Sequence, residues 1–198
     1  MNSLKIMNKQ KFEYFLNAVH YCMWLFERKS QDIINRTFLL IISPIPKYLL
    51  SSKYKERFYR YQKQRMTELD KFFNDKKSGF SIGFAHHNFG AFYSIYTCIL
   101  SFVIQALYIK FNGEINTFVI LITIAIPIGI CYIPAYKAVF SKDKYLQYFK
   151  QFEKEDEHWH KKWKRRTTVF ILGAIASIIF AIYLYFTILD VQVQFPWM

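Results

Sequence analysis

The chain has 198 residues and a formal net charge of +13, and its residues are 53% hydrophobic, 20% aromatic and 21% charged. This composition is too apolar for the surface of an ordinary soluble domain, and it has too many charges for a chain wholly buried in lipid. The three cysteines lie far apart and form no CxxC pair, which argues against a disulfide framework and a zinc ribbon.

Residues 1–77 are predicted to form a basic cytosolic arm of amphipathic helices at the membrane surface. From Phe12 to Phe26, apolar residues recur at helical spacing, but this helix is too short to span a bilayer. The uncharged run Thr37–Pro46 has only ten residues and contains two prolines. We expect it to lie on the membrane surface or to pack against another segment, because each proline removes a backbone donor.

The second helix of the arm is predicted over Lys47–Phe73. A basic helix with an aromatic face is typical of an element that lies on a membrane surface or binds a partner protein. The stretch Asn74–Gly79 (NDKKSG) then ends the helix with turn-forming residues. The apolar and aromatic stripe of this helix consists of Leu50, Tyr54, Phe58, Tyr61, Leu69 and Phe72.

Residues 78–136 are predicted to form a transmembrane helical hairpin. Its first span is placed at about 88–109 and its second at about 115–136, with the short connection KFNGE between them. The second span contains Pro127 and Pro134, whose effect on the backbone must be compensated by neighbouring helices or side chains. We therefore expect a kinked helix that packs against others.

Residues 137–166 are predicted to form a basic, mostly helical cytosolic loop that precedes a third transmembrane helix. The uncharged run Thr167–Leu189 has 23 residues. As a helix it would be about 34 Å long, enough to cross a hydrocarbon core of about 30 Å. Residues 190–198 would form an external tail. Basic residues and tryptophans just before this span are expected among the lipid headgroups: Lys161, Lys162, Lys164, Arg165, Arg166, Trp159 and Trp163.

The distribution of basic residues predicts the orientation in the membrane. Residues 1–88 contain 16 Lys and Arg and residues 137–166 contain 10, so three spans would place 26 of the 27 on one face. Because Lys and Arg concentrate in cytoplasmic segments, this asymmetry predicts a cytoplasmic N-terminus and an external C-terminus in the cell membrane. It also accounts for the net charge without nucleic acid as a partner.

Two faces of the predicted spans carry small and polar residues at helical spacing. Such faces let helices approach closely and form hydrogen bonds across the contact. We interpret them as packing faces within the bundle. In the first span the residues are Ser94, Cys98, Ser101 and Gln105; in the third they are Gly173, Ser177 and Ala181.

A metal site is a weaker interpretation of the histidines and carboxylates near the cytosolic surface. Glu153, Glu157 and His160 would share one helical face, and His86 or His87 could complete the set. A helical di-metal site needs more ligands than these, and pairing of Glu157 with Lys161 on a solvated helix explains the acidic residues as well. No metal or other cofactor is therefore predicted.

The expected fold is an all-α integral membrane protein with three transmembrane helices and cytosolic amphipathic helices. The expected role is non-catalytic: a scaffold or subunit that binds anionic lipid and a protein partner, or a second copy of itself. One alternative is a metal-dependent membrane enzyme that uses the His and Glu cluster. Another is an oligomeric pore-forming effector, whose channel would be lined by the face from Ser94 to Gln105.

Overall fold

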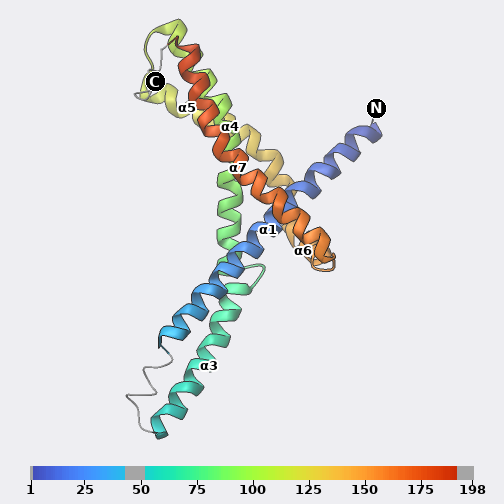
Figure 1. The fold of residues 1–198 in the computed structure, drawn as a ribbon. Coiled ribbons are helices and arrows are strands. Elements are labelled where there is room, and N and C mark those ends of the chain that lie inside the picture. Colours follow the sequence, from blue (N-terminus) through green and yellow to red (C-terminus); the bar gives the residue numbers. More distant parts are fainter. Residues whose placement is uncertain (1, 43–51, 191–198) are drawn as a thin grey trace. The chain divides into compact units, whose positions relative to one another are not determined.

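The computed structural model describes residues 2–42 and 52–190, and within these ranges all regular secondary structure is helical (Figure 1). The chain divides into two compact units. The first combines residues 1–19 with residues 89–198, and the second contains residues 20–88. Helices α1 (Asn2–Ile42) and α4 (Phe80–Asn112) each contribute residues to both units.

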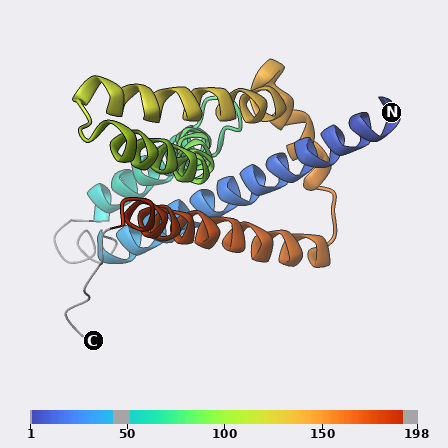
Figure 2. The same ribbon diagram turned by 90° about the horizontal axis from the view of Figure 1, so that it is seen from above.

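Among the residues that the structure describes, three helices are long and apolar enough to cross a membrane, in agreement with the three predicted spans. They are α4, α5 (Thr117–Val139) with its helical continuation to Phe152, and α7 (Glu157–Ile188). The first two form the predicted hairpin (Figure 2). Asn116 caps the start of α5 by accepting a hydrogen bond from the Val119 amide at 2.9 Å.

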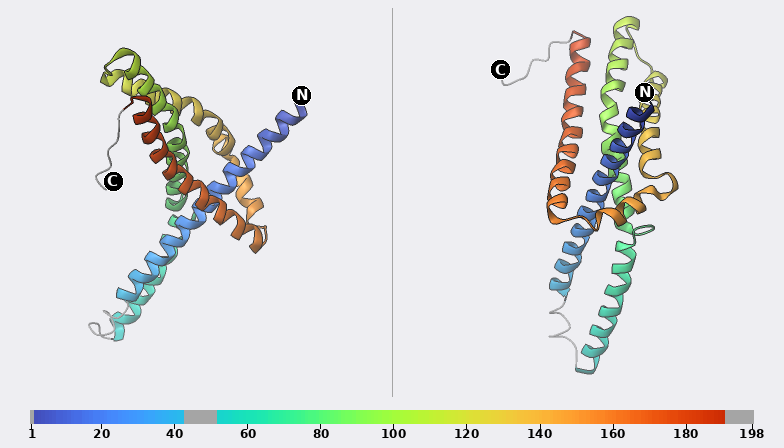
Figure 3. Two further views of the ribbon diagram at one scale, coloured as in Figure 1. Left: turned by 45° about the horizontal axis from the view of Figure 1, so that its top comes forward. Right: turned by 90° about the vertical axis from the view of Figure 1, so that its right-hand side faces the viewer.

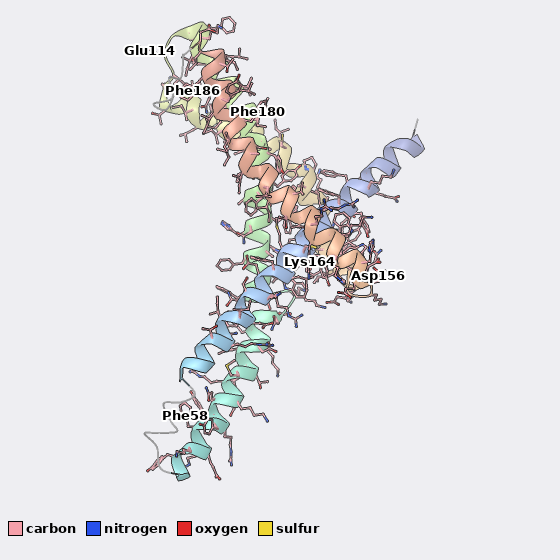
Figure 4. The ribbon with its side chains drawn as sticks, in the orientation of Figure 1. Phe58, Glu114, Asp156, Lys164, Phe180 and Phe186 are labelled. Carbon is pink, nitrogen blue, oxygen red and sulfur yellow. The ribbon has the colours of Figure 1, made fainter. Side chains whose placement is uncertain are left out.

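In the first unit, the turn between α4 and α5 and the C-terminal end of α7 lie at the same end (Figure 3). Lys110 and Asp190 form an ion pair of 3.0 Å there. Glu114 and Phe186 mark this end in Figure 4, whereas Asp156 and Lys164 lie toward the opposite end of α7. The α4–α5 turn and the C-terminal end of α7 therefore lie at one end, and the start of α7 lies toward the other, as expected for three helices that cross a membrane.

The three long helices bury small and polar side chains and expose large apolar ones. Thr97, Ser101 and Thr123 are buried, as are alanines of α4 and α7. This arrangement is the reverse of that in a water-soluble bundle, and it is the one expected where hydrocarbon surrounds the helices. The exposed apolar side chains include Leu100, Leu107, Phe118, Leu121, Ile126, Ile130, Leu172, Ile175, Ile179 and Phe180.

Residues 13–17 of α1 pack against the other helices of the first unit at the end opposite Lys110. Asn17 donates to the Ala138 carbonyl at 3.0 Å, and Lys144 pairs with Glu13 at 2.8 Å. The ring of Tyr14 lies 5.2 Å from that of Phe152. Residues 13–17 are thus integrated with the spans, whereas the sequence analysis placed them in a separate arm that ran to residue 77.

The helical structure between α5 and α7 is broken at two places. A 3-10 turn, η1 (Ser141–Asp143), precedes the short helix α6 (Lys144–Phe152), and Lys142 and Asp143 have positive φ angles of 58° and 52°. A second break follows α6. It ends at Asp156, whose side chain caps α7 by accepting from the Trp159 amide at 2.7 Å.

The second unit contains the remainder of α1, all of α3 (Ser52–Asn74) and the first residues of α4. The turn predicted at Asn74–Gly79 is present. A Cβ atom at Gly79 would lie 2.4 Å from the Asp75 carbonyl oxygen, so the turn requires glycine. The Ser78 hydroxyl donates to the Asp75 carboxylate, and this bond, followed by one from the Lys77 amide, lowers the pKa of Asp75.

Much of α3 is exposed, including Tyr54, Tyr61 and Phe72 of the predicted stripe. Arg65 lies over the Tyr61 ring, with 5.5 Å between its guanidinium carbon and the ring centroid. The predicted start of this helix and Leu50 lie outside the described residues, as does the end of the run Thr37–Pro46.

Candidate functional site

A cavity of about 1100 Å³ opens along the N-terminal half of α7 in the first unit. We call it the basic cavity. One wall comes from successive turns of α7, and Phe15 of α1 and Tyr96 of α4 supply the rest. The lining residues from α7 are His158, Lys161, Lys162, Arg165, Arg166, Val169, Phe170 and Gly173.

The wall from α7 changes from charged to apolar along the helix axis. Its residues recur every three or four positions, so they occupy one helical face. The basic part ends at Arg166 and the apolar part begins at Val169, two residues after the start of the uncharged run at Thr167. From Lys162 to Gly173 the face extends about 16 Å at 1.5 Å per residue. The cavity therefore has a basic half and an apolar half.

The four basic side chains of the cavity differ in their partners. Lys161 forms an ion pair of 2.9 Å with Glu157, and the guanidinium of Arg166 lies 4.8 Å from the Trp163 ring centroid. Lys162 and Arg165 have no carboxylate partner within the part of the chain that the structure describes. Arg166 likewise has no carboxylate partner among the described residues, so three positive charges in the basic half are without a paired carboxylate.

The apolar half depends on close contact between α4 and α7. The Tyr96 hydroxyl donates to the Phe170 carbonyl at 2.5 Å, and the two rings lie 5.2 Å apart. A Cβ atom at position 173 would come within 2.5 Å of the Tyr96 hydroxyl oxygen. Gly173 is therefore the residue that lets Tyr96 approach α7. Phe15 completes this half, with its ring 6.3 Å from that of Phe170.

The residues predicted to meet lipid headgroups fall into two groups. Lys161, Lys162, Arg165 and Arg166 line the basic cavity, while Lys164 is exposed on another face of α7. The two tryptophans turn toward the protein. Trp163 is only 4% exposed, and the indole of Trp159 donates to the Tyr14 hydroxyl at 2.9 Å.

The predicted packing faces lie largely inside the first unit. In α4, Ser101 is 1% exposed, and Gln105 donates to the Thr123 hydroxyl of α5 at 3.0 Å. Ser94 accepts from the Cys98 thiol at 3.8 Å along the same helix. In α7, Ala181 is fully buried, and Ser177 donates to the Gly173 carbonyl at 2.8 Å. The amide of Gln105 is thus satisfied within one copy of the chain.

The candidate metal ligands are not brought together. Within residues 2–42 and 52–190, no three His, Cys, Asp or Glu side chains are grouped closely enough to hold a metal ion. Glu153 lies in the break before α7, so it does not share a helical face with Glu157 and His160. His87 is exposed. His86 instead lies against His20, with 2.9 Å between Nδ1 of His86 and Nε2 of His20.

The positions of His20, Phe15 and Tyr96 were not predicted from the sequence. His20 is fully buried, and burial, followed by the nearby His86, lowers its pKa. Phe15 and Tyr96 line the basic cavity from helices distant in sequence, and no local pattern in the sequence indicates this. Of the cavity's lining, only the basic cluster before the third span could be recognised from sequence.

Comparison with known proteins gives no further guidance, because no protein family, curated protein or solved structure matches the chain.

Proposed function

We propose that this chain is a non-catalytic multi-pass membrane protein that binds anionic lipid and partner proteins through its basic helices. It acts as a scaffold or subunit in the cell membrane. Its N-terminus and its basic segments lie in the cytoplasm, and its C-terminus lies outside.

One observation carries this proposal: the apolar outer surface of α7 gives way to a basic segment within a few residues. Ile175, Ile179 and Leu172 expose apolar surface, and Lys161 to Arg166 follow toward the start of the helix. A helix with this profile is stable where hydrocarbon meets an aqueous layer. Anionic lipids attract such segments by about 1 kcal/mol for each Lys or Arg near the surface.

The interior of the bundle supports a structural role for its polar residues. A pore would need the face of Ser101 and Gln105 to line a channel, but these side chains are buried in the first unit. Gln105 is bonded to Thr123 there. Interhelical bonds of this kind hold helices together in lipid.

Partner binding is proposed for α3. This helix carries seven Lys and Arg residues and exposes Tyr54, Tyr61 and Phe72. Exposed aromatic and basic side chains on one helix suit a contact with an acidic protein surface, because aromatic residues and arginine are enriched in interfaces. Chemical cross-linking in native membranes, followed by mass spectrometry, would identify such a partner.

The lipid preference can be tested with the purified full-length chain. In mixed micelles with equal amounts of phosphatidylglycerol and phosphatidylcholine of matched acyl chains, native mass spectrometry should show enrichment of the anionic lipid. The enrichment should shrink between about 0.1 M and 1 M salt, because the Debye length falls from about 10 Å to 3 Å. Equal retention of both lipids at low salt would contradict the proposal.

A further inference from the structure

We propose that the basic cavity binds one phospholipid whose headgroup ends in a phosphate monoester. The phosphate would lie against Lys162 and Arg165, and an acyl chain would lie along Val169, Phe170 and Gly173. This inference rests on the membrane location proposed above, and it narrows the ligand from anionic lipids in general to one class.

The charge of the cavity selects a monoester over a diester. A phosphate monoester carries about −1.5 to −2 charges at pH 7, whereas a phosphodiester carries only one. Lys162, Arg165 and Arg166 supply three positive charges without carboxylate partners among the described residues, and Arg166 lies over the Trp163 ring. Lys161 is already paired with Glu157. A doubly charged headgroup therefore offsets more of this positive charge than a singly charged one does.

The donors of the cavity suit a phosphate group. Arginine presents a planar fork of N–H groups that can bond two phosphate oxygens at once, and lysine adds a mobile point charge. Lys162 and Arg165 are three residues apart, so both extend from the same side of α7. Their side chains can therefore converge on one headgroup.

The apolar half argues for a lipid rather than a soluble phosphate compound. Beyond the basic residues, the cavity continues along α7 between Phe15 and Tyr96. A soluble anion would leave this apolar surface exposed, while an acyl chain would cover it. The volume of about 1100 Å³ is also slightly above the range of about 300–1,000 Å³ that is common for small-molecule pockets.

The test compares short-chain lipids with the same acyl groups, added to the full-length chain in a neutral detergent. Dioctanoyl phosphatidic acid should bind about tenfold more tightly than dioctanoyl phosphatidylglycerol, because its second charge meets a second cation. Changes in intrinsic tryptophan fluorescence can report binding, since Trp163 lies next to the cavity residue Arg166. Glycerol 3-phosphate, which has the same headgroup without acyl chains, should bind far more weakly.

Two sets of variants test the two halves of the cavity. Lys162→Gln and Arg165→Gln should each weaken phosphatidic acid binding by about tenfold, whereas Lys164→Gln, which removes the same charge outside the cavity, should change it by about twofold or less. Val169→Trp should weaken binding by filling the apolar half. Leu172→Trp is its control, because Leu172 is exposed on the same helix and does not line the cavity.

Each contrary result has a distinct meaning. Equal affinity for phosphatidic acid and phosphatidylglycerol, measured on the unmodified chain, would overturn the monoester assignment. Equal losses from Lys164→Gln and Lys162→Gln would overturn the cavity as the site and leave the proposed anionic-lipid binding intact. Tight binding of glycerol 3-phosphate would indicate a soluble ligand. No preference for either anionic lipid over phosphatidylcholine would contradict the proposed function itself.

Discussion

His20 is a fully buried histidine in the second unit, and its Nε2 atom lies 2.9 Å from Nδ1 of His86. In a hydrogen bond between these two nitrogens, one carries the hydrogen and the other accepts it. If both imidazoles are protonated, every ring nitrogen carries a hydrogen and the bond is lost. Burial, followed by the proximity of His86, lowers the pKa of His20. The neutral form is thus the one that the fold accommodates.

The stability of this unit should fall on acidification below about pH 6.5, the ordinary pKa of histidine. In that range the unfolded chain binds a proton at residue 20 that the folded chain does not, so the free energy of unfolding decreases as pH falls. The slope from one such group is at most about 1.4 kcal/mol per pH unit, and it falls toward zero as the pH rises above about 6.5. Thermal unfolding of the purified chain between about pH 5 and 8 measures this.

The variant His20→Gln should reduce the pH slope, because residue 20 then no longer titrates. His87→Gln is a matched control, since His87 is exposed in the same unit. An unchanged slope in His20→Gln would show that other groups cause the pH dependence.

At the scale of the helices, the predicted spans coincide with the three helices of the described residues that are long and apolar enough to cross a membrane. The predicted second span at 115–136 corresponds to α5 at Thr117–Val139, and the third ends at Ile188 instead of Leu189. Length and lack of charge are the main requirements for a helix in hydrocarbon. Such helices can therefore be predicted from a single sequence. The extent of α1 was not predicted. Its polar residues Asn17 and His20 interrupt the apolar pattern, although in the structure both are buried and bonded.

The break between α6 and α7 was also not predicted. Tyr145, Phe149, Phe152, Trp159 and Trp163 recur at helical spacing. This spacing favours a mostly helical loop, in which Glu153 and Glu157 would share one face. The Asp156 side chain caps α7 instead, which places these two carboxylates on either side of a helix start. Capping by Asp competes with helix continuation, and tertiary packing of Trp159 on Phe152, with ring centroids 4.8 Å apart, favours the break.

The contact between α4 and α7 predicts a specific effect at Gly173. Gly173→Ala should destabilise the bundle by about 1–3 kcal/mol, because the new methyl group would collide with the Tyr96 hydroxyl, 2.5 Å away. Gly129→Ala is the control: its Cβ would meet nothing within 4 Å, and alanine favours a helix over glycine by about 0.5–1 kcal/mol. Thermal unfolding in detergent can compare the two.

A double variant identifies the colliding atom. Tyr96→Phe removes the hydroxyl, so Gly173→Ala should cost less in that background than in the unmodified chain. The same loss in both backgrounds would mean that the Tyr96 hydroxyl does not limit the approach of the helices.

For the whole molecule, the sequence was sufficient for the helical class, the number of candidate spans and the basic residues before the third one. The basic cavity could not be predicted, because it joins Phe15 and Tyr96 to α7 over more than 70 residues of sequence. Contacts of this kind depend on which helices pack together, and no periodicity within one helix carries that information. The division of residues 1–77 between two units was unpredictable for the same reason.

The topology of the chain tests the account most directly, because lipid binding by the basic segments requires all of them on the cytosolic side. A reporter that is active only in the cytosol should work when fused after Lys77 or inserted within residues 142–150. It should be inactive at Asn112 and after Met198. The reason is that three spans place 26 of the 27 basic residues on one side. Cytosolic activity at the C-terminus would contradict the three-span arrangement and, with it, the proposed position of the basic cavity at the inner surface of the membrane.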